Sequence, residues 1–165
     1  MIEEGPLMQK PSAKITVYAA FSVIAILAAM QFIPYGKNRS NPPVAREPVW
    51  SSPEIRSLAK RACFDCHSNE TVWPWYSRIA PVSWLVLKDV NDGRTVLNFS
   101  EWEGGARKGE HPEKIREELI EGEMPPIQYR LVHAGASLTE GERRQLADGL
   151  AGAAMADMRH ILTEK

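Results

Sequence analysis

The most uniformly apolar stretch of the chain runs from Ile15 to Ile33 and reads ITVYAAFSVIAILAAMQFI. It contains no charged residue, and Gln31 is its only strongly polar side chain. A helix of this length is about 28 Å long at roughly 1.5 Å per residue, which matches the hydrocarbon thickness of a bilayer. Because a buried helix of a soluble domain is rarely apolar on every face, the pattern predicts a transmembrane anchor over residues 15–33, preceded by a short cytoplasmic N-terminus over residues 1–14.

A cleaved signal peptide is the alternative for the same segment. Lys10 and Lys14 would form its basic start, and the cut would follow Ala28 or Ala29. Either cut also needs a small residue two positions earlier, where the chain has an isoleucine or a leucine. The sequence therefore favours a retained anchor.

Basic residues flank the span on both sides, so the positive-inside rule does not orient it. Lys10 and Lys14 precede the span, and Lys37, Arg39 and Arg46 follow it. The short N-terminus resembles no domain and is easier to leave in the cytoplasm. We therefore expect the C-terminal part on the periplasmic (extracytoplasmic) side of the cytoplasmic membrane.

The segment after the span is rich in residues that resist helix formation. Prolines recur from Pro34 to Pro53 and are mixed with Gly36, Asn38 and Asn41. This composition favours extended, polyproline-like chain. It predicts a linker over residues 34–48, followed by a folded domain over residues 49–165. As a tether, some 19 extended residues of the proline-rich stretch up to Pro53 could reach roughly 60 Å.

Within the folded part, apolar residues recur at helical spacing in several segments. Ser52 and Thr139 are helix-capping residues, and Glu142 completes a capping box with Thr139. Gly93 and Gly122 are expected to mark C-terminal ends. The predicted helices span residues 53–62, 81–91, 112–121 and 139–161. Since no sustained alternation with period two occurs, the predicted fold class is all-α.

Composition narrows the range of functions. The chain has 165 residues, of which 44% are hydrophobic and 25% charged, as expected for one globular domain. Lys and Arg number 20 against 21 Asp and Glu, for a formal charge of −1. This balance does not suggest a nucleic-acid binder, so the chemistry is expected in a local site.

The two cysteines of the chain lie three positions apart, in the motif Cys63-Phe64-Asp65-Cys66-His67. This CxxCH pattern is the known signal for attachment of c-type haem. The thiols of Cys63 and Cys66 can each add to one vinyl group of the haem, and His67 can bind the iron as the proximal ligand. The motif therefore predicts one covalently attached haem c.

Three alternatives to haem attachment exist for the CxxCH motif. A thioredoxin-like dithiol would need a βαβ setting, which the surrounding sequence does not offer. A zinc site would combine the cysteines with His111 and His133, but neither a second CxxC nor a closely spaced histidine pair completes it. Chance proximity of two cysteines and a histidine is the third alternative.

Met124 is the best candidate for the distal iron ligand. It follows a predicted helix end at Gly122, and Pro125 and Pro126 stiffen the chain behind it. A methionine ligand raises the reduction potential of haem iron. His133 and His111 are rival ligands. The remaining candidates are expected to pack or to lie at the surface, and they are Met155, Met158 and His160.

Aromatic residues are frequent after the motif, and they could either wall a haem pocket or form an ordinary core. They are Trp73, Trp75, Tyr76, Trp84 and Trp102. Three basic residues could pair with haem propionates, although a solvated position is the commoner role. They are Arg78, Arg94 and Lys108.

Taken in order, these motifs resemble a known bacterial family. The resemblance rests on the span ending in QFI at residues 31–33, NPP at 41–43, CFDCH at 63–67, WPWY at 73–76, LNFSEW at 97–102 and GEMPP at 122–126. The chain is similar to the bacterial haem-binding-domain family, membrane-anchored c-type cytochromes with a single haem.

The resemblance implies a compact helical cytochrome fold, with haem attached through Cys63 and Cys66 and bound at the iron by His67 and Met124. It implies no defined catalysis, so we expect an electron carrier with redox partner proteins rather than an enzyme. A haem-based sensor, a peroxidase-like protein and a structural haem subunit of a larger membrane complex are the alternatives. A carrier should have its sixth iron position filled, whereas a sensor or peroxidase should have it open.

Overall fold

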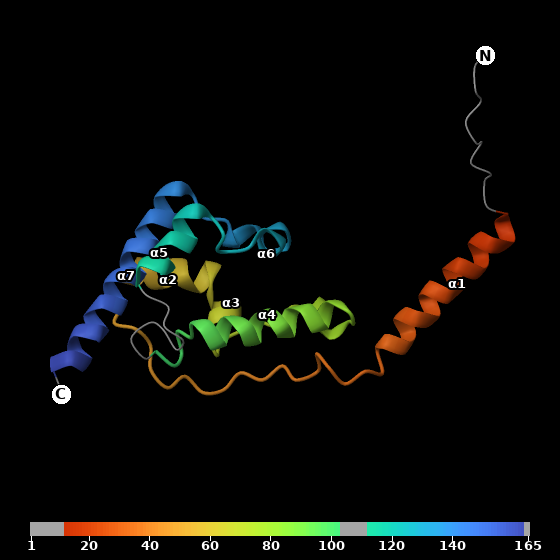
Figure 1. Cartoon of the computed structure of the whole chain (residues 1–165), viewed down its shortest axis with the longest axis horizontal. Coiled ribbons are helices and arrows are strands. Elements are labelled where there is room, and N and C mark those ends of the chain that lie inside the picture. The colour runs from red at the N-terminus through yellow and green to blue at the C-terminus, as the bar shows by residue number, and fades with distance from the viewer. Residues whose placement is uncertain (1–11, 103–111, 164–165) are drawn as a thin grey trace, which may run out of the picture.

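The computed structural model describes residues 12–102 and 112–163, and its regular elements are helical. Seven α-helices and two 3-10 helices (η) lie in these ranges (Figure 1): α1 Ala13–Met30, α2 Pro53–Ala62, α3 Phe64–His67, η1 Trp75–Arg78, α4 Val82–Val96, α5 Pro112–Glu121, α6 Ile127–Val132, η2 Ala134–Ala136 and α7 Glu140–Thr163. Within the described ranges there is no β-strand, only one isolated bridge between Arg46 and Glu101. The all-α prediction is confirmed.

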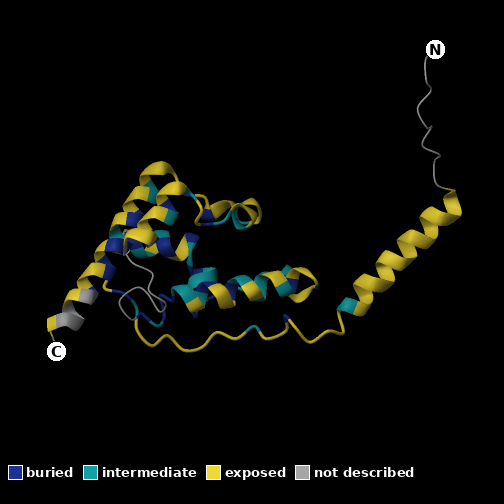
Figure 2. Cartoon of the chain, in the orientation of Figure 1, coloured by how far each residue is buried: buried dark blue, intermediate teal, exposed yellow. Residues whose placement is uncertain are grey.

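Helix α1 projects away from the rest of the chain, and none of its residues is buried (Figure 2). Its 18 residues are long and apolar enough to cross a membrane. The helix ends at Met30 rather than at the predicted Ile33, because the chain turns at Gln31 and Phe32 ahead of Pro34. An exposed apolar helix is not the core helix of a soluble domain, but a membrane span and a signal sequence both fit it.

The core lies where α2, α5 and α7 meet. Helix α5 packs along α7, and α2 packs against α7 (Figure 1). Buried apolar side chains from these helices join two aromatic residues of the 97–102 segment. The core cluster comprises Ile55, Ala59, Ala62, Phe64, Phe99, Trp102, Ile115, Leu119, Leu138, Leu146, Ala147, Leu150, Ala153 and Ala154.

The predicted helix starts are confirmed by their capping contacts. The backbone N–H of Ile55 donates to Ser52 Oγ at 3.4 Å. At the start of α7, Thr139 N donates to Glu142 Oε2 at 2.8 Å, and Glu142 N donates to Thr139 Oγ1 at 3.3 Å. This reciprocal pair is a capping box.

The predicted end of α4 at Gly93 is wrong, because the helix continues to Val96. Gly93 keeps helical geometry, and its lack of a side chain serves packing instead. A Cβ atom at this position would lie 2.5 Å from the carbonyl oxygen of Cys66. The glycine therefore lets α4 touch the backbone of the CxxCH motif. Gly122, by contrast, does end α5 and has a φ of 80°.

The segment over residues 34–48 is extended, as predicted, but it is not a free tether. Arg39 Nη1 donates to the carbonyl oxygen of Ser77 at 3.1 Å. Asn41 Nδ2 donates to the carbonyl oxygen of Thr71 at 2.9 Å. Because such bonds recur along the segment, it lies along the domain as a strap and does not provide the roughly 60 Å reach expected from an unattached chain.

Helix α6 was not predicted from the sequence. Its six residues, IQYRLV, are too few to show helical periodicity, and Pro126 immediately precedes them. None of these residues is buried. The helix follows Met124 and extends the loop that covers one side of the cavity lined by the CxxCH motif.

Candidate functional site

A cavity of about 420 Å³ lies between the α3–α4 pair and the 124–129 segment. This volume falls in the range of about 300–1,000 Å³ that is usual for small-molecule and cofactor sites. Cys63, Cys66, His67 and Met124 all line it. The structure therefore brings together the four residues that the sequence singled out, although Met124 is far from the motif along the chain.

His67 has a fixed orientation at the cavity wall. Its Nδ1 lies 3.0 Å from the carbonyl oxygen of Gly93 and 3.1 Å from that of Leu97. Both neighbours are acceptors, so Nδ1 carries the proton and the lone pair is on Nε2. A backbone carbonyl on one ring nitrogen is the usual means by which proteins orient a metal-binding histidine.

The two cysteine side chains occupy an apolar and largely buried place. Cys63 follows α2 and Cys66 lies within α3, so that they flank one short turn of helix. Burial raises the pKa of each thiol to about 12. Both are therefore neutral at physiological pH, unlike the acidic thiols of dithiol oxidoreductases.

Met124 faces the same cavity from the loop between α5 and α6. Its backbone N–H donates to the carbonyl oxygen of Glu118, six residues earlier in α5, at 3.1 Å. The methionine is 37% exposed and is not a core residue. Its place in a proline-rich loop at the cavity, as the sequence indicated, leaves the thioether available to a group bound there.

The rival histidine ligand His133 lies elsewhere. Its Nε2 lies 3.2 Å from Tyr76 Oη, and its ring stacks on that of Tyr129 at 4.1 Å. It does not line the cavity. His111, Lys108 and Lys10 fall outside the described residues, as do the side chains of Met158 and His160. Met155 is on α7 and is not a cavity residue.

Tyr129 and Asp65 form a contact that the sequence did not indicate. Tyr129 Oη donates to Asp65 Oδ2 at 2.6 Å, which joins α6 to the middle of the CxxCH motif. Burial and this bond raise the pKa of Tyr129. Asp65 also accepts from the backbone N–H of Val72 at 2.9 Å. The motif is thereby linked to both the loop that follows it and the opposite wall of the cavity.

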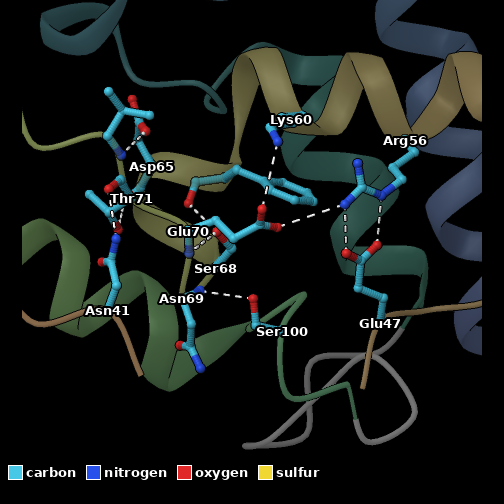
Figure 3. Close-up of polar contacts among 12 residues, drawn as sticks. Asn41, Glu47, Arg56, Lys60, Asp65, Ser68, Asn69, Glu70, Thr71 and Ser100 are labelled. Carbon is cyan, nitrogen blue, oxygen red and sulfur yellow. Dashed lines mark hydrogen bonds and ion pairs between the residues drawn. The ribbon is translucent and has the colours of Figure 1, made fainter. Parts of the chain in front are cut away.

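The chain after His67 is held by polar contacts, which Figure 3 shows. Ser68 Oγ donates to the carbonyl oxygen of Phe64 at 2.8 Å. Asn69 N donates to Ser100 Oγ at 2.9 Å (Figure 3). Because Ser68, Asn69 and Ser100 are buried, these bonds satisfy groups that have no access to water. They fix the exit of the chain from the motif.

The aromatic residues that follow the motif do not wall the cavity. Trp102 stacks on Phe99 in the core at 6.0 Å, while Trp75 is 74% exposed. Neither Trp73 nor Trp84 lines the cavity, and its aromatic lining comes from Phe99 and Tyr129. The pocket-wall interpretation was wrong for the tryptophans, because the buried aromatic that approaches the motif is a phenylalanine from the core.

Arg94, for which the sequence left a haem propionate and a solvated position open, makes hydrogen bonds to the backbone in the structure. Its guanidinium donates to the carbonyl oxygens of Ser68 (2.7 Å) and Ser40 (3.0 Å). It thus ties the strap to the end of the motif. Arg78 is exposed on η1 and does not line the cavity.

The charged groups at the cavity that the structure describes are carboxylates. Asp89 and Asp92 on α4 and Glu118 on α5 contribute to its lining. Partial burial raises the pKa of Asp89. Asp92 is paired with Lys88, whose Nζ lies 2.6 Å from Asp92 Oδ2. These groups were not recognised in the sequence because nothing in the local pattern of α4 distinguishes them from a solvated face.

The side chains that face the cavity suit a haem rather than a bare metal ion. Within residues 12–102 and 112–163, no cluster of three or more His, Cys, Asp or Glu side chains is arranged to hold a bare metal ion. His111, a ligand of the alternative zinc site, lies outside these residues. One oriented imidazole, one thioether and two thiols facing an apolar cavity do fit a haem, whose iron such nitrogen and sulfur donors would bind. The residues present therefore fit the group that the motif predicts.

Comparisons with known proteins agree with this fit. Residues 25–152 match the model of the haem-binding domain family. No curated protein and no solved structure gives a match to the chain. Because the family model covers most of the chain and includes the motif, the cavity and Met124, the chain belongs to the haem-binding domain family.

Proposed function

We propose that this protein is a membrane-anchored c-type cytochrome with one haem, and that it passes single electrons at the outer face of the cytoplasmic membrane. The observation that carries the proposal is the convergence of Cys63, Cys66, His67 and Met124 on one cavity. A haem bound there would supply a one-electron Fe(III)/Fe(II) couple.

Each residue has a separate task in this proposal. Cys63 and Cys66 hold the macrocycle through two thioether bonds. His67 binds the iron through Nε2, and the carbonyls of Gly93 and Leu97 keep its ring oriented. Met124 would supply the iron with a thioether ligand, which favours the reduced metal. With His67 and Met124 both bound to the iron, the protein would have no open site for a substrate, so we propose no enzymatic activity.

The membrane anchor is supported by two observations. No residue of α1 is buried, and the helix is long enough to span the bilayer. The family match begins at Ala25, inside α1, so the end of this helix belongs to the matched region. A retained span is consistent with both observations. The periplasmic side is proposed for the domain because c-type haem is attached outside the cytoplasm.

The proposal is tested on the full chain, produced in a host that matures c-type cytochromes. We expect a reversible one-electron titration, and we expect the reduced protein not to bind carbon monoxide at neutral pH, because Met124 occupies the iron. Rapid binding of carbon monoxide would contradict the carrier function and favour a sensor or peroxidase-like protein. Absence of redox cycling would favour a structural haem subunit.

A further inference from the structure

The end of α1 is attached directly to the domain. Gln31 Nε2 donates to the carbonyl oxygen of Ala80 at 3.0 Å, and Ala80 N donates to Gln31 Oε1 at 3.0 Å. This two-point bond fixes the side chain on the η1–α4 junction. Tyr35 continues the attachment, since its ring meets that of Trp84 edge-on at 6.5 Å. The η1–α4 junction is therefore held at the level where α1 ends.

Exposed apolar side chains surround this attachment point. Trp75 on η1 is 74% exposed, and three aliphatic residues at or near the start of α4 are also exposed. Those residues are Ile79, Val82 and Leu85. Soluble domains rarely leave such groups together in water, and a contiguous apolar patch marks an interaction surface.

Helix α6 extends the same surface. Leu131 is 79% exposed, and Ile127 and Val132 are exposed as well. The end of α6 is linked to η1 through one side-chain contact, because Tyr76 Oη lies 3.2 Å from Nε2 of His133, the residue after α6. In Figure 1, α6 and the start of α4 both lie on the side of the domain that faces α1. We call these exposed residues of η1, α4 and α6 the seating face.

The chemistry of the seating face fits a lipid surface better than a protein partner of unknown kind. Its aromatic and aliphatic groups are the types that enter the boundary between headgroups and acyl chains. Helix η1 carries the exposed Arg78 and no carboxylate, which suits anionic lipid headgroups. A membrane is also the one partner that α1 would bring to this place.

We propose that the seating face rests in the headgroup region of the bilayer that α1 spans. The inference depends on the proposed anchoring of α1 and adds an orientation to it. The domain is then fixed on the membrane surface instead of moving at the end of a linker. The cavity, which lies between α4 and the loop that leads to α6, is held near the lipid surface.

The test uses the full chain in nanodiscs of phosphatidylethanolamine and phosphatidylglycerol. A photoreactive benzophenone amino acid replaces Trp75, Leu131 or Val49, one at a time. Val49 is the matched control, because it is 78% exposed and apolar but lies beside α7. After irradiation, mass spectrometry of the denatured chain detects lipid adducts. We expect adducts at positions 75 and 131 and none above background at 49.

The outcomes distinguish a failure of the seating-face proposal from a failure of the proposed membrane anchor. Equal adducts at all three positions, or cross-linked dimers in place of lipid adducts at position 131, would overturn the seating face. A chain that stays in the nanodisc without lipid adducts at 75 and 131 would also overturn it and leave the anchor intact. A chain that does not stay in the nanodisc would contradict the anchor itself. Circular dichroism of each variant checks the fold, and Val132 replaces either position that fails to fold.

Discussion

The imidazole of His67 and the thioether of Met124 reach the same cavity from regions that are built differently. On the His67 side, two carbonyl oxygens at 3.0 and 3.1 Å fix the ring, and α4 packs directly on the motif. On the Met124 side, a proline-rich loop carries a residue that is 37% exposed and is held by one backbone bond to α5. We call these the proximal wall and the distal wall.

The proximal wall and the distal wall hold the two proposed iron ligands in different ways. The proximal wall is preorganised by the rigid end of a helix, so its geometry should persist whether or not the distal ligand is bound. The distal wall depends on a loop with fewer contacts, which costs less to move. Changes on the proximal wall should therefore alter attachment and stability, whereas changes on the distal wall should alter access to the iron.

The largest effect is expected from removal of the proximal imidazole. His67→Gly keeps both cysteines, so we expect haem to remain on the denatured chain while the native absorption spectrum loses the signature of its nitrogen ligand. Added imidazole should restore much of that spectrum, because Gly93 and Leu97 still offer carbonyl acceptors. A variant with the spectrum of the unchanged protein would remove His67 from the iron.

The next largest effect concerns the contact between α4 and the motif. Gly93→Ala places a Cβ atom 2.5 Å from the backbone oxygen of Cys66, so the helix must move. We expect a loss of about 1–3 kcal/mol in the free energy of unfolding, as for overpacked cores, seen in thermal or denaturant unfolding. The control is Gly152→Ala on α7, where a Cβ meets open space and should add about 0.5–1 kcal/mol. Equal stability of the two variants would contradict the close packing of α4.

On the distal wall, Met124→Ala should open the iron with little effect on stability. We expect the reduced variant to bind carbon monoxide and its reduction potential to fall, because the thioether no longer favours the reduced metal. Met155→Ala, on α7 and away from the cavity, is the control and should change neither property. If Met124→Ala keeps the reduction potential of the unchanged protein and still does not bind carbon monoxide, another residue is the sixth ligand.

A smaller effect is expected where the two walls touch. Tyr129→Phe removes the 2.6 Å hydrogen bond to Asp65 but keeps the ring. The loss of a bond to a carboxylate should cost about 1–2 kcal/mol of unfolding free energy. Tyr35→Phe, which keeps its contact with Trp84, should cost less. No difference between the two variants would show that the walls are not coupled through this bond.

The smallest predicted effect depends on pH. Partial burial raises the pKa of Asp89 above its ordinary value of 3.8, so ionised Asp89 is less favourable in the folded chain than in the unfolded chain. Asp89→Asn should therefore be slightly more stable at neutral pH, and this gain should disappear as the pH falls through the raised pKa. A gain that grows in acid would contradict the sign of the shift.

The comparison of the walls also explains what the sequence could reveal. Cys63, Cys66 and His67 lie close together in the chain, so the prediction that they share one site follows from spacing alone. Gly122 and the prolines around Met124 are local signals too, so the loop was predictable. The carbonyls that orient His67 come from a helix expected to stop at Gly93, because a glycine inside a helix gives the same local signal as one at its end.

The tertiary contacts were less predictable. The strap over residues 34–48 has the composition of a free linker, and only its bonds to Ser77 and Thr71 distinguish it. The tryptophans after the motif are large apolar residues in a suggestive position, yet Phe99 supplies the aromatic surface at the cavity. Whether a segment lies against the domain, and which aromatic ring lines the cavity, depend on long-range packing. Spacing and composition do not encode such packing directly.

The central claim is that this chain carries one haem through both cysteines of its CxxCH motif, and the intact mass of the denatured protein tests it most directly. The full chain, purified from a host that attaches haem to such motifs, should show the mass of the polypeptide plus one haem. Cys63→Ser/Cys66→Ser should show the polypeptide mass alone. The polypeptide mass alone for the unchanged chain would contradict the account, provided that the same host attaches haem to a known c-type cytochrome in a parallel preparation.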